Sequence, residues 1–167
     1  MTQLPLVIRP ELPSDADAID RLHERAFGPG RFARTAFRLR EGAPHLQHLS
    51  FTTLVGTLLV GSVRMTPAMA GTVPALVLGP LTVDPAFENR GIGSALLARA
   101  LEAARETRHR LVLLVGDERY YGRFGFKALP EGKLTLPGPV DPRRFLALAF
   151  DQGVLDEANG SVTTRPR

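Results

Sequence analysis

The chain has 167 residues, no cysteine, and a formal net charge of +4 from 21 basic and 17 acidic side chains. This length favours one domain with a sizeable core. The lack of cysteine excludes a disulfide scaffold, a thiol nucleophile and a thiolate metal site. The sequence opens with no leader-like segment, and no apolar run approaches the roughly 20 residues of a membrane span. We therefore expect a cytoplasmic protein without a membrane or nucleic-acid partner.

The N-terminal residues predict a short strand followed by a helix. Leu6–Ile8 form an apolar run that ends before Pro10, and Ser14 is the expected cap of the helix that follows. The apolar positions at helical spacing predict its buried face: Ile19, Leu22 and Ala26.

A second helix is expected over residues 31–40, after the glycine and proline residues that end the first. Arg31, Arg34 and Arg38 would share one face of this helix. That face is either solvent-exposed without a further role, or it binds an acidic substrate or a cofactor phosphate.

The period of the pattern then changes to that of strands. Residues 49–54 and 58–65 predict an antiparallel hairpin around Gly56. Pro67 and residues 71–74 are expected to form the connection to the next strand.

That next strand, Ala75–Val83, is interrupted by Gly79 and Pro80. Proline cannot donate a hydrogen bond to a neighbouring strand, and glycine inside a strand often marks a bulge. The pair predicts a strand that leaves its neighbour at this point, although an ordinary edge bulge has the same signature.

A long helix is expected from Ile92 to Arg105, and its apolar stripe predicts the buried residues Ile92, Leu96, Leu97, Ala100, Leu101, Ala103 and Ala104. Gly91 and Gly93 lie where the free N–H groups of the first turn emerge. Glycine allows close approach of a ligand, and a helix N-terminus favours negative charge. The pattern fits a pyrophosphate site, and it also fits a plain structural turn.

The rest of the chain predicts further strands and one short helix. Leu111–Val115 reads as a buried parallel strand, residues 120–124 as a short helix and 145–150 as a last strand. The predicted domain is single, with a core over residues 6–150 and a polar tail over 151–167, loosely ordered beyond Gly160.

Two stretches together resemble the GCN5-related N-acetyltransferase (GNAT) superfamily, in particular its YhbS-like bacterial branch. They are Glu88-Asn89-Arg90-Gly91-Ile92-Gly93 and the segment from Val115 to Phe126. The resemblance implies an α/β (α+β) fold with a mixed, mostly antiparallel central sheet, splayed fourth and fifth strands, and flanking helices. Glu88 departs from the family motif, which usually has Gln or Arg at this position.

The resemblance also implies a function, namely transfer of an acetyl group from acetyl-CoA (coenzyme A) to an amine acceptor, a small molecule or a peptide. Tyr121 would be the general acid that protonates the leaving sulfur, with Tyr120 beside it as a packing residue. The implied cofactor-binding residues are Leu81, Thr82, Val83, Asn89, Arg90, Gly91, Ile92, Gly93, Ser94, Ala95, Tyr121 and Arg123. No metal is expected, and a homodimer is compatible with the family.

The base that would take the proton of the amine is not identified by the sequence, because the strand Ala75–Val83 carries no ionisable side chain. The candidates are Asp84, His23, Glu24, Glu41, His45 and His48.

Two other functions share parts of the pattern. A non-catalytic acyl-CoA-binding or regulatory domain would explain an acidic Glu88, but it has no need of a phenol at Tyr121. A dinucleotide-binding oxidoreductase would need a third glycine where this chain has Leu96.

Overall fold

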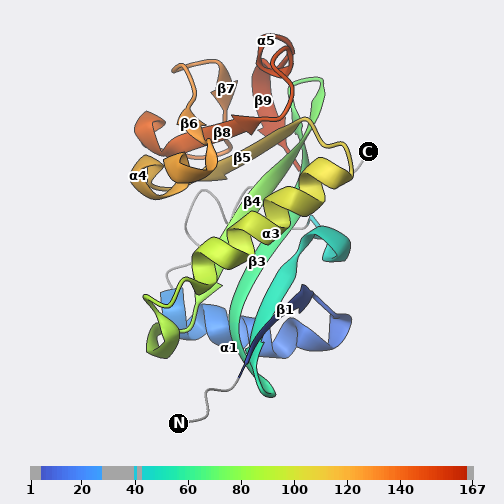
Figure 1. The fold of residues 1–167 in the computed structure, drawn as a ribbon. Helices are drawn as coiled ribbons and strands as arrows, with labels where there is room; N and C mark the ends of the chain where they lie inside the picture. The colour runs from blue at the N-terminus through green and yellow to red at the C-terminus, as the bar shows by residue number, and fades with distance from the viewer. Residues whose placement is uncertain (1–4, 28–39, 41–42, 165–167) are drawn as a thin grey trace.

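The computed structural model describes residues 5–27, 40 and 43–164. Within that part of the chain, strands form a sheet in the order β1-β2-β3-β4-β5-β8-β6, with β9 paired to β3 and β7 paired to β9 (Figure 1). The strands are β1 (Leu6–Pro10), β2 (Phe51–Val55), β3 (Leu58–Ala70), β4 (Val73–Val83), β5 (Leu111–Val115), β6 (Lys127–Ala128), β7 (Leu134–Thr135), β8 (Phe145–Ala149) and β9 (Gly160–Thr163). The helices are α1 (Ala16–Phe27), α3 (Ile92–Glu106), α4 (Glu118–Tyr121) and α5 (Val154–Glu157).

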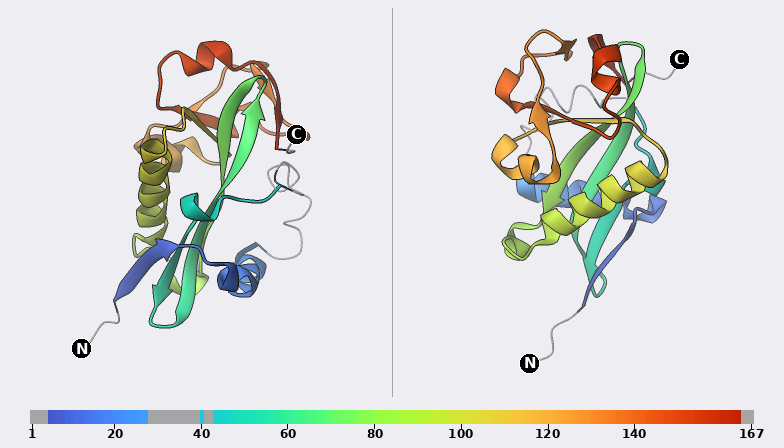
Figure 2. Two further views of the ribbon diagram at one scale, coloured as in Figure 1. Left: turned by 90° about the vertical axis from the view of Figure 1, so that its right-hand side faces the viewer. Right: turned by 45° about the horizontal axis from the view of Figure 1, so that its top comes forward.

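The β4–β5 and β7–β9 pairs are parallel, and the other pairs are antiparallel. The predicted mixed, mostly antiparallel sheet with flanking helices is therefore confirmed. Helices α3 and α1 lie on opposite faces of the sheet (Figure 2).

Alternate residues of the central strands enter different cores, as the two-residue period of a strand requires. Leu76 and Leu78 pack with α3, whereas Ala75 and Val77 belong to a second cluster on the other face. Strand β5 is apolar throughout because both of its faces are covered. Every residue predicted for the buried face of α3 is buried.

Strands β4 and β5 are paired over a short distance, with Leu76 opposite Val112 and Val77 opposite Leu113. Two residues later β4 contains a cis Gly79-Pro80 peptide, and its register with β3 shifts there. Beyond the bulge β4 continues along β3 as far as Val83, while β5 diverges from it (Figure 1). The predicted departure of the strand from its neighbour is confirmed.

The first helix differs from the prediction at its N-terminal cap and on its buried face. A 3-10 turn over Pro13–Asp15 precedes it, and the carboxylate of Asp15, not the hydroxyl of Ser14, accepts the hydrogen bond from the N–H of Leu12 at 2.8 Å. Ile19 and Leu22 are buried as predicted, but the third buried residue is His23, and Ala26 is exposed. The expected helix over residues 31–40 lies outside the described residues except for Arg40.

The connection after β3 is shorter than predicted, because β3 runs through Pro67 to Ala70. The pairing of β3 with β2 ends at Val63, and its pairing with β9 begins at Met69. Among the described strands, Pro67 thus lies where β3 is paired on one side only, by β4, which is a position that tolerates proline.

The prediction of loose order beyond Gly160 is wrong as far as Thr164, the last described residue. Strand β9 pairs with both β3 and β7, and Val154, Ala158 and Val162 are buried in the second core cluster. These three residues are four positions apart, which is a helical spacing and does not predict a strand over Gly160–Thr163, so only the long-range pairing reveals this element.

Candidate cofactor and acyl-transfer site

The start of α3 has the geometry of an anion site. Gly91 is the N-cap in the left-handed region at φ 78°, and a side chain there would meet no atom within 4 Å. Backbone conformation, not space, therefore requires this glycine. The first helical hydrogen bond is donated by the N–H of Ala95 to the carbonyl oxygen of Gly91 at 3.0 Å. The N–H groups of Ile92, Gly93 and Ser94 accordingly have no acceptor within the helix.

Two further features suit an anion at this helix start. The first turn of α3 contains no acidic residue, so the positive end of the helix dipole is not neutralised. At Gly93, a side-chain Cβ would lie 3.0 Å from the hydroxyl of Tyr120 and 3.7 Å from a methyl group of Val83. Gly93 therefore keeps the space between α3, α4 and the end of β4 open.

The end of β4 presents backbone groups on the side away from β3, where β5 has diverged. The N–H of Asp84 donates to the carbonyl oxygen of Val60 on β3 at 2.8 Å, and the register places Thr82 opposite Ser62. Hydrogen-bonded residues alternate in an antiparallel pair, so Thr82 also faces β3, whereas the N–H and C=O groups of Leu81 and Val83 point away from it. These groups are suited to bind an extended, amide-containing ligand as an added strand would.

Tyr121 is held in a tight apolar setting. Its ring lies 6.0 Å from that of Phe126 and 5.0 Å from that of Tyr120, both in edge-on arrangements. A side chain at Gly116 would overlap the Tyr121 ring, which explains the glycine at the end of β5. Burial first, and then the nearby Tyr120, raise the pKa of Tyr121 to about 12 against the opposing effect of Arg144.

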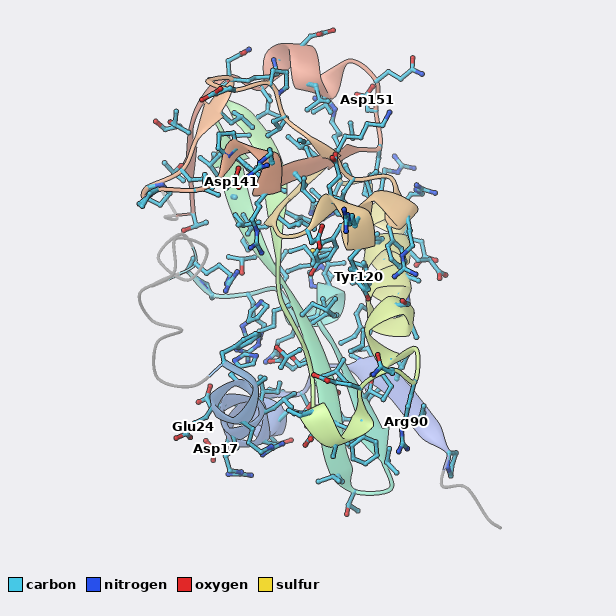
Figure 3. All side chains as sticks on the ribbon, turned by 90° about the vertical axis from the view of Figure 1, so that its left-hand side faces the viewer. Asp17, Glu24, Arg90, Tyr120, Asp141 and Asp151 are labelled. Carbon is cyan, nitrogen blue, oxygen red and sulfur yellow. The ribbon has the colours of Figure 1, made fainter. Side chains whose placement is uncertain are left out.

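Tyr120 lies beside α3 (Figure 3). Its hydroxyl oxygen is 3.4 Å from the hydroxyl oxygen of Ser94 on that helix. The guanidinium of Arg123 stacks 4.7 Å from the centre of the Tyr120 ring and donates to the Tyr120 carbonyl oxygen. The sequence motif did not indicate this contact between α4 and the helix start, because the two segments are 26 residues apart.

The remaining predicted cofactor residues occupy different surroundings. Asn89 precedes α3 with a positive φ of 64°, and the exposed Arg90 stacks 5.2 Å above the Phe87 ring. The side chain of Ile92 is buried in the core, which leaves its N–H as the group available to a ligand. Glu88 is exposed beside the turn.

The candidate bases are dispersed. Asp84 caps the turn after β4 and forms an ion pair with Arg25 at 3.1 Å. Glu24 and His48 are exposed, and His23 lies on the buried face of α1. Glu41 lies outside the described residues, as do Arg31, Arg34 and Arg38. His45 is the candidate that contacts a buried carboxylate: its Nε2 lies 2.6 Å from an oxygen of Glu11.

Glu11 is the centre of a polar cluster that sequence reasoning missed. Its side chain is 1% exposed, and Arg64 of β3 donates to it through Nε at 2.9 Å and Nη2 at 3.3 Å. Burial opposes ionisation, but the hydrogen bonds from His45 and Arg64 outweigh it and hold the pKa of Glu11 below its usual value. The partners lie 34 and 53 residues away in sequence, and no motif connects them.

Arg40 lies next to this cluster. Its Nη1 is 3.1 Å from the position that a Cβ would take on Gly79, in the β4 bulge. Burial and the like charge of Arg64 lower the pKa of Arg40 to about 10. The guanidinium thus lies at the point where β4 and β5 separate.

Among the described residues, no group of three or more His, Cys, Asp and Glu side chains could hold a metal ion. No helix in the described part of the chain is long and apolar enough to cross a membrane.

A family model described as an acetyltransferase (GNAT) domain matches residues 50–128. The chain is 30% identical over 159 residues to the uncharacterized N-acetyltransferase YhbS of Escherichia coli K12, a match that covers 94% of this chain and 95% of that protein. It is also 30% identical over 118 residues to the uncharacterized N-acetyltransferase YjhQ of the same organism, a match that covers 68% of this chain and 65% of that protein.

Solved structures of GNAT proteins are also similar to this chain. The crystal structure of Escherichia coli YhbS in complex with CoA superposes with a TM-score of 0.82 at 25% identity, over 99% of this chain and 92% of that one. A GNAT family acetyltransferase from Brucella melitensis in complex with acetyl-CoA gives a TM-score of 0.67 at 29% identity, over 89% of this chain and 90% of that one.

Proposed function

The chain belongs to the GCN5-related N-acetyltransferase family, and from this premise we propose that it transfers an acetyl group from acetyl-CoA to an amine with Tyr121 as general acid. The observation that carries the proposal is the meeting of two binding features. Gly93 joins the two: its N–H is one of the free donors at the start of α3, and its Cβ position lies 3.7 Å from a methyl group of Val83, whose backbone, like that of Leu81, faces away from β3.

Different residues of the site would bind different parts of acetyl-CoA. The free N–H groups of Ile92, Gly93 and Ser94 would hold the pyrophosphate, with the helix dipole favouring its charge. Ala95, the other residue that the resemblance implies here, already donates its N–H to Gly91 within the helix. Leu81 and Val83 would bind the amides of the pantetheine arm. The side chains of Asn89 and Arg90, which directly precede α3, and of Arg123, which stacks on the Tyr120 ring, would contact phosphates, and arginine suits that contact. The exposed position of Glu88 leaves this backbone cradle intact.

Acetyl-CoA supplies an acetyl group activated as a thioester. The protein must accept a proton from the amine and deliver one to the departing sulfur. A phenol whose pKa is near 12 stays protonated throughout the neutral range, so Tyr121 can serve as that donor at its hydroxyl. Tyr120, whose hydroxyl contacts Ser94, would instead support the pyrophosphate end of the site.

The test is a turnover assay with acetyl-CoA and a panel of polyamines, aminoglycosides, amino acids and peptides, monitored by thiol release and by the mass of the acetylated amine. Thiol release that depends on one class of amine is expected. Tight binding of acetyl-CoA without acetylation of any amine would contradict the proposal and favour an acyl-CoA-binding domain.

A further inference from the structure

We propose that the amine acceptor carries a carboxylate, and that Arg40 binds this carboxylate at the point where β4 and β5 separate. This inference rests on the proposed function and deepens it, because it assigns the chemical class of the acceptor. Three observations carry it: the location of Arg40, the charges around it, and the face of the sheet on which it lies.

The first observation is location. The Arg40 guanidinium lies against Gly79, two residues before Leu81, whose backbone faces away from β3. It also borders a cavity of about 10 Å³, room for about one water molecule, whose other walls are Val77 of β4, the end of β5, Leu136 and Phe145 of β8. Gly79 itself lies in the bulge where β4 leaves β5, so the contact with Gly79 places a cation beside the expected position of the thioester.

The second observation is charge. The cluster contains one carboxylate, that of Glu11, and this group is already engaged by Arg64 and His45. Among residues 5–27 and 43–164, no carboxylate pairs with Arg40, although the like charge of Arg64 is close enough to lower its pKa. Two guanidinium groups close together in a partly buried site are unfavourable, and a bound anion would relieve their repulsion. A carboxylate matches the planar fork of a guanidinium.

The third observation is the face of the sheet. Val63 and Met65 pack toward α3, so Arg64 between them projects from the opposite face. Val77 and Phe145 of the cavity belong to the core cluster on that opposite face. The Arg40 cavity and the Glu11 cluster thus lie on the side opposite α3, whereas the proposed pyrophosphate site is at the start of α3. The two reactants would meet at the bulge from opposite faces.

The test compares matched pairs of amines that differ only in the carboxylate. α-Amino acids and ω-amino acids of increasing length are assayed against their amides for thiol release from acetyl-CoA. We expect the acids to show a kcat/KM at least about 10-fold above that of the amides, which is the loss typical of one charge-assisted hydrogen bond. Arg40→Gln should abolish this preference, and Arg40→Lys should retain part of it.

Controls separate this inference from the proposed function. Arg21→Gln removes an exposed arginine of α1 and should leave the preference unchanged. The affinity for acetyl-CoA should be the same in wild type and Arg40→Gln, because Arg40 lies apart from the start of α3. If the protein fails to bind acetyl-CoA, only the proposed function is contradicted. Arg40 is then still tested by comparing the affinity of the protein for N-acetyl amino acids with its affinity for their amides.

Three results would overturn the assignment of Arg40. The first is equal use of acids and amides. The second is an acid preference that survives Arg40→Gln. The third is a preference for succinyl-CoA over acetyl-CoA that is lost in Arg40→Gln, because the guanidinium would then bind a carboxylate of the acyl group and not of the acceptor.

Discussion

At the scale of single residues, two adjacent tyrosines in α4 have different surroundings. Tyr121 is enclosed by Gly116, Phe126 and Tyr120, whereas the hydroxyl of Tyr120 reaches Ser94 on α3. The sequence motif indicates Tyr121 as the acid, and its raised pKa agrees with a group that must remain protonated.

Replacement of each tyrosine by phenylalanine tests this division. We expect Tyr121→Phe to lower kcat about 100-fold, the lower range for a lost general acid, with the Kd for acetyl-CoA unchanged. Tyr120→Phe is the matched control and should keep kcat within about threefold. A normal kcat in Tyr121→Phe together with a large loss in Tyr120→Phe would reverse the two roles.

The pH dependence of the rate gives a second check on Tyr121. Because its pKa is raised to about 12, the phenol stays protonated from neutral pH to about pH 10 and loses its proton only above that range. Any fall in kcat between about pH 8 and about pH 10 should therefore occur equally in wild type and in Tyr121→Phe, as measured in a pH–rate profile of both proteins. A fall that occurs in wild type and not in Tyr121→Phe would contradict Tyr121 as the acid.

The ionisation of Glu11 should make the stability of the folded protein depend on pH. Its pKa is held below the usual value in the folded state, so its ionised form stabilises the protein above the unfolded pKa of about 4.3. That contribution is lost as pH falls through the lower folded pKa. Glu11→Gln should reduce the free energy of unfolding by about 3 kcal/mol at neutral pH and flatten its decline below about pH 4.5.

Urea unfolding at neutral pH and at about pH 4 measures both effects of Glu11→Gln, and Glu24→Gln on the exposed face of α1 is the control. Parallel pH dependence in wild type and Glu11→Gln would show that the cluster around Glu11 does not bind protons differently on folding.

At the scale of elements, local patterns predict α3, β5 and the β2–β3 hairpin because each has a strong period or a turn signal. The irregularity at Gly79-Pro80 was also predicted, since proline cannot donate to a neighbouring strand and glycine inside a strand often marks a bulge. Long-range features were not: β9 and the Glu11 cluster depend on partners far away in sequence.

The C-terminal segment provides a test at this scale. Val154 at the start of α5 is fully buried in the second core cluster, so Val154→Ala should lower the free energy of unfolding by about 2 kcal/mol through lost burial and an added cavity. Gln152→Ala, two residues earlier and exposed, should change it by less than about 0.5 kcal/mol. Equal stabilities in chemical denaturation would show that the tail is not part of the cooperative fold.

At the scale of the whole molecule, the sheet separates the two proposed ligand sites. Helix α3 and the outward edge of β4 form the proposed site for acetyl-CoA, and the cluster of Arg40, Arg64, Glu11 and His45 lies on the opposite face. The bulge in β4 lies between them, at the point where the strand leaves β5.

The most direct test of this arrangement is calorimetric titration of the purified protein with acetyl-CoA. Wild type should bind it, and Gly93→Glu should lose at least about 100-fold in affinity, because a carboxylate would occupy the space beside the free N–H groups of α3. Ala98→Glu places the same charge on the exposed side of α3 and should bind like wild type. Equal affinities for Gly93→Glu and Ala98→Glu would contradict a cofactor site at the start of α3.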